Sequence, residues 1–252
     1  MIEICMFGPL RVYDNERQLL LTDFHGIKPR HVLEVLALHR GHPVSKERLA
    51  DLLWHGKPPA SWLSTLEGYV SLLRRDLAAP DRPSVIITRN GGYLLDASRV
   101  KLDLSTFDSL LGAAEATEPT GALELLTKAL DLVRGDVLVG ERSLPWVLEA
   151  RERYQQRVRH AIVRAGRLAL QAGDVDTAAR HGQAACDLDP LAEDGWQIVI
   201  EAQWRAARRS EALRSFSDLR SLLDRELGIA PCRSLQQLVT KVLRDEPLLV
   251  AA

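Results

Sequence analysis

Residues 59–77 read PASWLSTLEGYVSLLRRDL, and their apolar pattern predicts a helix. The apolar positions recur at helical spacing: Leu63, Leu66, Val70, Leu73 and Leu77. Pro59 suits the first turn of such a helix, where a missing N–H costs nothing. At about 100° per residue, the opposite face carries a mostly small and polar set: Ser61, Ser64, Thr65, Gly68, Leu72 and Arg75. This outward face ends in the basic pair Arg74-Arg75, so it either meets an anionic partner or is simply solvated.

Two more helices are predicted upstream of this stretch. KPRHVLEVLALHRG (28–41) has Pro29 at its start and Gly41 as its stop. VSKERLADLLW (44–54) has Ser45 as N-cap and Glu47 in its first turn. The loop HGKPP (55–59) then leads into the helix at 59–77. Two helices joined by a short turn are a helix-turn-helix candidate, in which the second helix enters a DNA groove.

Short β segments flank these helices on both sides. Residues 2–8, 10–14 and 17–21 are separated by turn-forming residues. Downstream, VIITR (85–89) and YLLD (93–96) surround Asn90-Gly91-Gly92, a strong hairpin signal. A hairpin at this point would form the wing of a winged helix, with Arg89 and Asn90 directed toward DNA backbone or minor groove.

From Leu102 onward the periodicity is helical throughout. Four positions have the relative spacing of the roughly 34-residue tetratricopeptide motif: Gly166, Ala178, Ala185 and Pro190. The other copies are degraded, since Ile200 and Asp224 replace the expected glycine and proline. Stacked helix pairs of this kind leave a concave surface for partners. The predicted fold is mainly α with a small β component: a winged helix-turn-helix at 1–98, then an all-α tetratricopeptide-like domain at 102–247.

One predicted helix in this second half has a basic face. Five residues fall within about 80° of one another when the helix is drawn end on: Arg153, Arg157, His160, Arg164 and Arg167. Such a face is either solvated or contacts an acidic partner or phosphates. We take Arg153, Arg157, Arg164 and Arg167 as candidate partner-binding residues.

Composition places the chain among folded globular proteins. Its 252 residues are 46% hydrophobic and 27% charged, with a net charge of −1. No apolar run approaches the roughly 18 residues of a membrane span, and the start MIEICMFGP lacks a signal-peptide pattern. The three cysteines are far apart in sequence, which fits a reducing cytoplasm. Residues 1–99 hold 13 Lys and Arg against 11 Asp and Glu, so charge for binding DNA must be local.

Motifs of catalysis are missing from the sequence. GxxxxGK[ST], HExxH, GxSxG and GxGxxG do not occur. The histidines at 25, 31, 39, 42 and 55 have no cysteine or carboxylate at metal-ligand spacing, so we interpret them as surface or helix-cap residues. We therefore expect no enzyme activity, no catalytic residue, no metal and no cofactor.

Four stretches carry a family resemblance. LADLLWHGKPPASWLSTLEGYVSLLRRDL (49–77) and ITRNGGYLL (87–95) resemble the OmpR-type winged helix of the Streptomyces antibiotic regulatory protein (SARP) family. ALDLVRG (129–135) with Trp146 downstream, and ELGIAP (226–231), are similar to the bacterial transcriptional activation domain that follows it in that family. The resemblance runs through nearly the whole chain in the family's order. Larger members append an ATPase module, so a chain ending at Ala252 would be the short form.

The resemblance implies a sequence-specific transcriptional activator of a biosynthetic or pathway-specific gene cluster, located in the cytoplasm at the nucleoid. Paired protomers would occupy direct repeats in double-stranded promoter DNA. They would recruit RNA polymerase through its sigma factor and through the C-terminal domain of the polymerase alpha chain. We expect DNA contacts from ten residues: Lys57, Ser61, Ser64, Thr65, Gly68, Leu72, Arg74, Arg75, Arg89 and Asn90.

Two departures from the family pattern keep an alternative open. Family members usually carry basic residues where this chain has Leu63 and Leu72, and Glu67 adds a negative charge to the helix. Leu63 falls on the expected core stripe and Leu72 on the outward face, so Leu72 removes a phosphate or base contact. The alternative function is a tetratricopeptide-type interaction adaptor whose winged helix no longer reads DNA.

Overall fold

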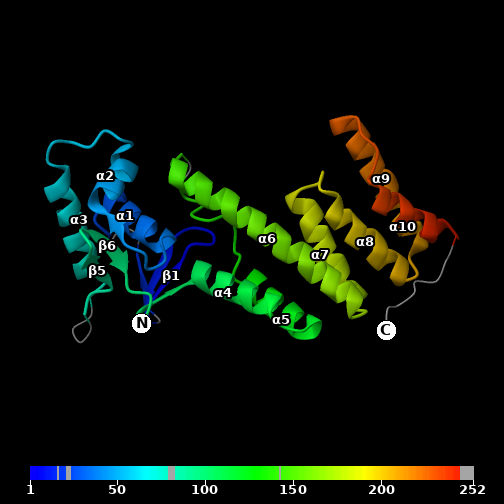
Figure 1. Ribbon diagram of the computed structural model, residues 1–252, viewed down its shortest axis with the longest axis horizontal. Helices are drawn as coiled ribbons and strands as arrows, with labels where there is room; N and C mark the ends of the chain where they lie inside the picture. The colour runs from blue at the N-terminus through cyan, green and yellow to red at the C-terminus, as the bar shows by residue number, and fades with distance from the viewer. Residues whose placement is uncertain (16, 21–23, 79–82, 142, 245–252) are drawn as a thin grey trace. The chain divides into compact units, whose positions relative to one another are not determined.

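The computed structural model describes residues 1–15, 17–20, 24–78, 83–141 and 143–244 (Figure 1). The chain forms two compact units. Unit 1 comprises Met1–Ser109 and Leu132–Tyr154, and unit 2 comprises Leu110–Asp131 and Gln155–Ala252. Helices α4 (Asp103–Glu115) and α6 (Pro145–Gln171) each contribute to both units. Within the described ranges, no helix combines the length and the apolar character needed to cross a bilayer.

A four-stranded sheet opens unit 1. Its strands are β1 (Ile2–Cys5), β2 (Arg11–Asp14), β3 (Arg17–Leu19) and β7 (Val100–Leu102), in the order β3-β2-β1-β7. The first three lie in the predicted β segments and pair antiparallel, whereas β7 pairs parallel to β1 and was not predicted. Ile2, Ile4 and Val12 are buried on one face.

The predicted three helices and hairpin follow in order, together with a two-residue strand that was not predicted. They are α1 (Ile27–Leu38), β4 (Val44–Ser45), α2 (Lys46–Trp54), α3 (Trp62–Asp76), β5 (Ile86–Arg89) and β6 (Gly92–Leu95). A second sheet has the order β4-β6-β5. The hydroxyl of Ser45 accepts a hydrogen bond from the Arg48 N–H at 3.1 Å, which confirms the N-cap. The three helices bury leucines against one another: Leu33, Leu36, Leu49, Leu53, Leu66 and Leu73.

Residues 132–154 belong by packing to the winged-helix unit. The Leu138 N–H donates to the Met6 carbonyl at 2.9 Å, and the Val139 N–H donates to the Gly8 carbonyl at 3.1 Å. Phe7 contacts the rings of Phe107 and Tyr154 edge-on, at centroid distances of 5.3 and 5.5 Å. Packing therefore divides the chain differently from the predicted division into 1–98 and 102–247. Residues 245–247 lie outside the described part.

Buried Asp103 fixes the end of β1 in this unit. Its carboxylate accepts hydrogen bonds from the N–H groups of Met6 and Phe7, at 2.7 and 2.9 Å. Burial raises the pKa of Asp103, and these backbone N–H groups oppose that rise. Removing the carboxylate would leave two buried N–H groups without acceptors.

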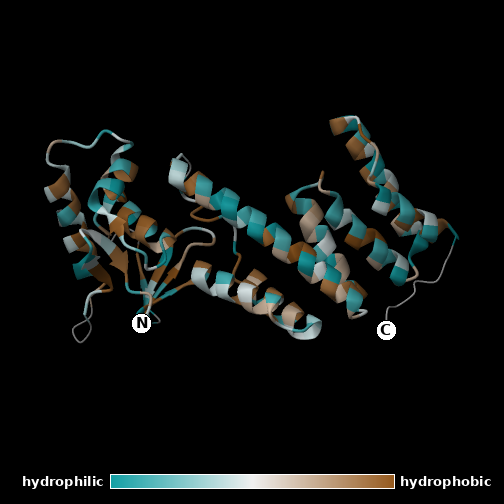
Figure 2. Ribbon diagram, viewed as in Figure 1, coloured by the Kyte–Doolittle hydropathy of each residue, from teal (hydrophilic) through white to brown (hydrophobic). Residues whose placement is uncertain are grey.

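All the secondary structure of unit 2 within its described residues is helical. Besides its parts of α4 and α6 it contains α5 (Pro119–Leu130), α7 (Val175–Leu188), α8 (Glu193–Arg205), α9 (Arg209–Leu227) and α10 (Arg233–Arg244). Helix α8 packs on α7, α9 and α10. A Cβ at Gly195 would lie 2.9 Å from the Cys186 N atom, so this glycine permits the close approach of α7 and α8. Helix α6 presents a largely hydrophilic face in the view of Figure 2.

Candidate nucleic-acid interface

Helix α3 begins later than its sequence suggests. Trp62 is its first residue, and Pro59 lies in the preceding turn, where its carbonyl accepts a hydrogen bond from the Trp62 N–H at 2.9 Å. Leu66, Val70, Leu73 and Leu77 are buried as predicted. Leu63 is 42% exposed, so its assignment to the core stripe is wrong. It stands in the first helical turn, one turn ahead of the first buried leucine.

The outward face of α3 differs in part from the predicted one. Ser61, Ser64, Gly68 and Arg75 are exposed as expected, whereas Thr65 and Leu72 are half-buried. Leu72 is therefore not the fully outward residue that the sequence suggested. Glu67 and Ser71 are exposed beside the predicted residues. A Cβ at Gly68 would meet nothing within 4 Å, so a partner surface has room to approach the backbone of α3 there.

The hydroxyls on this face are locally anchored. Ser64 Oγ and Thr65 Oγ1 both donate to the Ser61 carbonyl, at 3.0 and 2.9 Å. Their oxygens retain acceptor capacity, because a hydroxyl offers two lone pairs besides its one proton. The face can thus accept hydrogen bonds from a partner with little rearrangement.

Arg74 connects α3 to the β5–β6 hairpin, which we call the wing. Its Nε donates to the Ile86 carbonyl at 3.1 Å, and its Nη2 donates to Thr88 Oγ1 at 2.8 Å. The guanidinium carbon also lies 5.8 Å from the centroid of the Tyr93 ring. These contacts direct Arg74 at the wing.

Lys46 approaches the same Tyr93 ring and pairs with Glu67. Lys46 Nζ lies 5.7 Å from the ring centroid and 2.7 Å from Glu67 Oε1. The hydrogen bond to Glu67 raises the pKa of Lys46. The negative charge that Glu67 brings to α3 is therefore paired within unit 1, which sequence spacing could not show.

Arg75 lies on the exposed side of α3. Its Nη2 is 2.6 Å from His25 Nε2, and its Nε is 3.5 Å from Asp76 Oδ1. The side chain is nevertheless 63% exposed. Exposure of this extent leaves guanidinium donors accessible to a phosphate group.

The wing tip and the α2–α3 loop supply further polar and cationic groups. Asn90 and Gly91 have φ of 52° and 74°, as a two-residue turn of type I′ requires. Arg89 and Asn90 are exposed at this tip, and Lys57 is exposed in the loop. The side chains of Lys57 and Arg89 form no hydrogen bond or ion pair with another described residue, so both cations are available to a partner.

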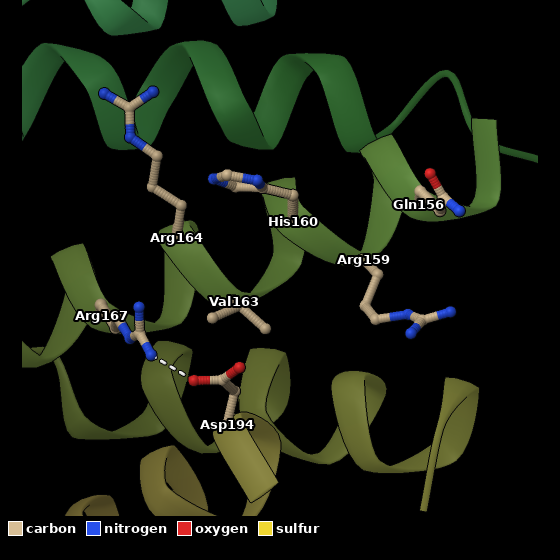
Figure 3. Close-up of a pocket in the computed structure, with 7 residues that line it drawn as sticks. All are labelled: Gln156, Arg159, His160, Val163, Arg164, Arg167 and Asp194. Carbon is tan, nitrogen blue, oxygen red and sulfur yellow. Dashed lines mark hydrogen bonds and ion pairs between the residues drawn. The ribbon is translucent and has the colours of Figure 1, made fainter. Parts of the chain in front are cut away.

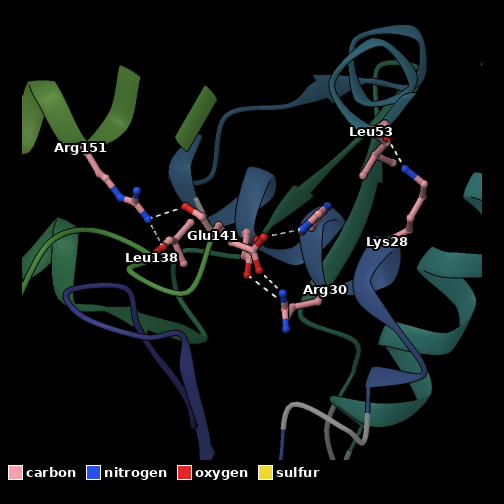
Figure 4. A network of polar contacts seen from close by, with 8 residues as sticks. Lys28, Arg30, Leu53, Leu138, Glu141 and Arg151 are labelled. Atoms are coloured by element: carbon pink, nitrogen blue, oxygen red, sulfur yellow. Dashed lines mark hydrogen bonds and ion pairs between the residues drawn. The ribbon is translucent and has the colours of Figure 1, made fainter. Parts of the chain in front are cut away.

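A polar cluster links α1 to the loop before α6 (Figure 4). Arg30 contacts the carboxylates of Glu34 and Glu141, and His31 Nε2 lies 3.1 Å from Glu141 Oε2. Burial lowers the pKa of His31 and raises that of Glu34 to about 8. His31 is buried, so its interpretation as a surface or cap histidine is wrong; His39 and His55 are the C-cap residues of α1 and α2.

The same cluster has the ligand types of a metal site. One atom each from His31, Glu34 and Glu141 lies within 4.8 Å of the others. Arg30, however, already places a guanidinium against both carboxylates. A divalent cation would have to displace the Arg30 guanidinium. Arg30 is therefore the cation that pairs with the two glutamates of this cluster.

The predicted basic face of α6 is partly engaged within the chain. The Arg153 guanidinium carbon lies 5.5 Å from the Tyr154 ring centroid. Arg164 donates to the Ala114 carbonyl at 2.8 Å, and Arg167 pairs with Asp194. Arg157 and His160 are exposed.

Comparisons with known proteins agree with a winged helix followed by a helical domain. Residues 102–243 match the family described as "Bacterial transcriptional activator domain", and residues 26–95 match "Transcriptional regulatory protein, C terminal". Regulatory protein DnrI of Streptomyces peucetius is 34% identical to this chain, over 98% of this chain and 93% of DnrI. Regulatory protein AfsR of Streptomyces coelicolor is 32% identical over 97% of this chain, which corresponds to 24% of AfsR.

A solved structure extends the likeness to the fold. Mycobacterium tuberculosis EmbR, in complex with a low affinity phosphopeptide, superposes with a TM-score of 0.85 at 26% identity. The match covers 99% of this chain and 66% of that one. The chain thus spans nearly all of DnrI but only part of AfsR and of the EmbR chain. With a DNA-binding winged helix followed by a bacterial transcriptional activator domain, it belongs to the SARP family of transcriptional regulators, which are not enzymes.

Proposed function

We propose that this regulator is a sequence-specific activator that reads promoter DNA with α3 and the wing. The observation that carries the proposal is the joint exposure of Arg75, Arg89 and Lys57 on three neighbouring winged-helix segments. Winged helices of this order insert the second helix of the pair into the major groove, and phosphates on either side need cations. The exposed small residues of α3, Ser64 and Gly68, allow that close approach.

The ten predicted contact residues divide by role in this proposal. Lys57, Arg75, Arg89 and Asn90 contact backbone or minor groove, and Ser61, Ser64 and Gly68 face the base edges. Thr65 and Leu72 lie at the rim of the interface, since they are half-buried. Arg74 positions the wing relative to α3 rather than contacting phosphate, because its donors are directed at Ile86 and Thr88.

The proposal also covers how the protein binds promoters and how it activates transcription. Two protomers would bind side by side on direct repeats about one helical turn apart. The helical part, 102–247 in our division, would recruit RNA polymerase through the sigma factor and the C-terminal domain of the polymerase alpha chain. Its contact residues would be on the basic face of α6: Arg153, Arg157, Arg164 and Arg167. The Streptomyces relatives support a biosynthetic gene cluster as the target and the cytoplasmic nucleoid as the site of action.

A footprint of the full chain on the DNA upstream of its own gene and of neighbouring genes tests this role. Protection of two equal blocks in one orientation is expected. Protection should weaken in Arg75→Ala with Arg89→Ala, and stay unchanged in Arg220→Ala, an exposed arginine of α9. Absence of protection, with intact folding, would favour the interaction adaptor whose winged helix does not read DNA.

A further inference from the structure

A pocket of about 340 Å³ lies in unit 2, between one face of α6 and the start of α8 (Figure 3). Helix α6 lines it with Arg159, His160, Val163, Arg164 and Arg167, and Asp194 comes from the first turn of α8. Arg159 and Arg167 are eight residues apart, which corresponds to about 12 Å along a helix. The pocket therefore presents three guanidinium groups and an imidazole over a length that suits a short peptide segment.

Each of the three arginines has guanidinium donors beyond those that its in-chain contacts use. Arg159 pairs with Asp189 at 2.8 Å through Nη1, Arg164 donates one bond to the Ala114 carbonyl, and Arg167 pairs with Asp194. A guanidinium carries five N–H donors in a planar fork. These in-chain contacts hold the side chains in place without exhausting them.

The in-chain partners also indicate which ligand group fits. Asp189 and Asp194 stand just before and within the start of α8 and already place carboxylates against Arg159 and Arg167. Asp194 is 57% exposed, so its pairing with Arg167 is open to exchange with an incoming carboxylate. Two arginines of the pocket, Arg159 and Arg167, thus already bind carboxylate groups within the chain.

Charge distribution argues against an extended nucleic acid at this pocket. Residues 110–131 and 155–252 hold 15 Lys and Arg against 17 Asp and Glu, a net charge of −2. A nucleic-acid backbone needs a continuous cationic track, whereas Arg159 and Arg167 of this pocket each already face an aspartate. A short acidic peptide needs no more than this local patch.

We propose that this pocket binds a short acidic segment of a partner protein through Arg159, Arg164 and Arg167. This deepens the partner contact proposed above and rests on it for the biological role of the complex. The binding itself requires no DNA. Arg159 and His160 join the interface, although neither was among the candidate partner-binding residues.

Fluorescence anisotropy of the full chain with a labelled peptide tests the proposal. The probe carries aspartates at alternate positions, and the matched peptide has asparagines in their place. Arg159→Gln with Arg167→Gln should weaken binding of the acidic probe at least about tenfold. Arg220→Gln makes the same type of charge change on α9 and should leave binding unchanged. Arg164 is left intact in this test because it bonds to α4.

Asp194→Asn gives a second readout that a merely structural pocket would not show. It releases Arg167 from its in-chain partner, so the acidic probe should bind more tightly. The asparagine peptide should bind none of these proteins. This variant also keeps the proposal testable if the double arginine variant fails to fold.

Three results would overturn the proposal: no binding of the acidic probe, equal weakening by Arg220→Gln, or no tightening in Asp194→Asn. In a further outcome, random-sequence duplex DNA displaces the probe from the wild-type chain but no longer binds the pocket variants. That result would instead assign the site to nucleic acid. A parallel DNA shift assay on the same variants distinguishes this failure from failure of promoter recognition. Pocket variants should shift promoter DNA like the wild-type chain.

Discussion

Arg74 Nη2 lies 2.8 Å from Thr88 Oγ1, so the last turn of α3 is fastened to the first strand of the wing. A second bond, from Nε to the Ile86 carbonyl, gives this arginine a fixed direction. Two adjacent arginines of the sequence therefore have different roles: Arg74 fixes the angle between helix and wing, and Arg75 faces outward.

Arg74→Ala should weaken DNA binding by misplacing the wing. We expect the free energy of unfolding to fall by about 1–3 kcal/mol, since the partly buried bond to the Ile86 carbonyl is lost. The salt dependence of DNA binding should keep the wild-type slope, because no phosphate contact is removed. Equilibrium unfolding and binding titrations at several salt concentrations measure both quantities. A log–log salt slope lowered by about 1 would show that Arg74 contacts a phosphate.

Arg75→Ala and Arg89→Ala should behave differently from Arg74→Ala. Each should lower the log–log salt slope by about 1, as loss of one phosphate contact does, with little change in thermal stability. Arg220→Ala is the control of equal charge. If the double variant retained the wild-type slope, neither arginine would contact phosphate.

Leu63 and Leu72 should respond in opposite ways to a basic replacement. Leu63 is 42% exposed, so Leu63→Arg should strengthen DNA binding, most clearly at low salt, and leave stability within about 0.5 kcal/mol. Leu72 is half-buried, so Leu72→Arg should lower the unfolding temperature. Thermal scans and binding titrations on both variants check this. Equal unfolding temperatures for Leu63→Arg and Leu72→Arg would contradict the difference in burial between Leu63 and Leu72.

Glu34 should make the stability of the protein depend on pH. Burial raises its pKa from the ordinary 4.5 to about 8, so the folded chain holds a proton that the unfolded chain releases. Its contribution to the free energy of unfolding is most favourable below about pH 4.5. This contribution falls as the pH rises from about 4.5 and is lost once the pH passes about 8. Glu34→Gln should therefore gain stability relative to wild type between pH 5 and pH 9.

The control for that experiment is Glu149→Gln, an exposed glutamate of α6. Chemical unfolding at several pH values provides the measurement. A pH-independent difference for Glu34→Gln would mean that Arg30 keeps Glu34 ionised in the folded protein.

Local patterns in the sequence predicted most elements of the fold. The helices, the N-cap at Ser45 and the Asn90-Gly91 turn follow from periodicity and backbone preference, which act within a few residues. Strand β7 was missed because three residues carry too little pattern. The packing of residues 132–154 with unit 1 depends on contacts far apart in sequence, such as Leu138 with Met6.

The candidate site was less predictable for the same reason. An angular projection treats all turns of a helix alike, yet Leu63 is exposed because the first turn of α3 extends beyond the packed leucines. The engagement of Arg74 with Thr88 and of Glu67 with Lys46 requires the folded positions of other elements. Sequence spacing identifies charged residues, but their partners decide which of them remain available.

Selection of bound duplexes from a random library, using the full chain, tests the central claim most directly. We predict enrichment of one motif as a direct repeat about a helical turn apart, bound at least about 10³-fold more tightly than a scrambled duplex at the same salt. The preference should diminish in Ser64→Ala with Gly68→Leu, whose changes lie on the exposed face of α3. Recovery of no motif, with enriched and scrambled duplexes bound equally, would contradict the account.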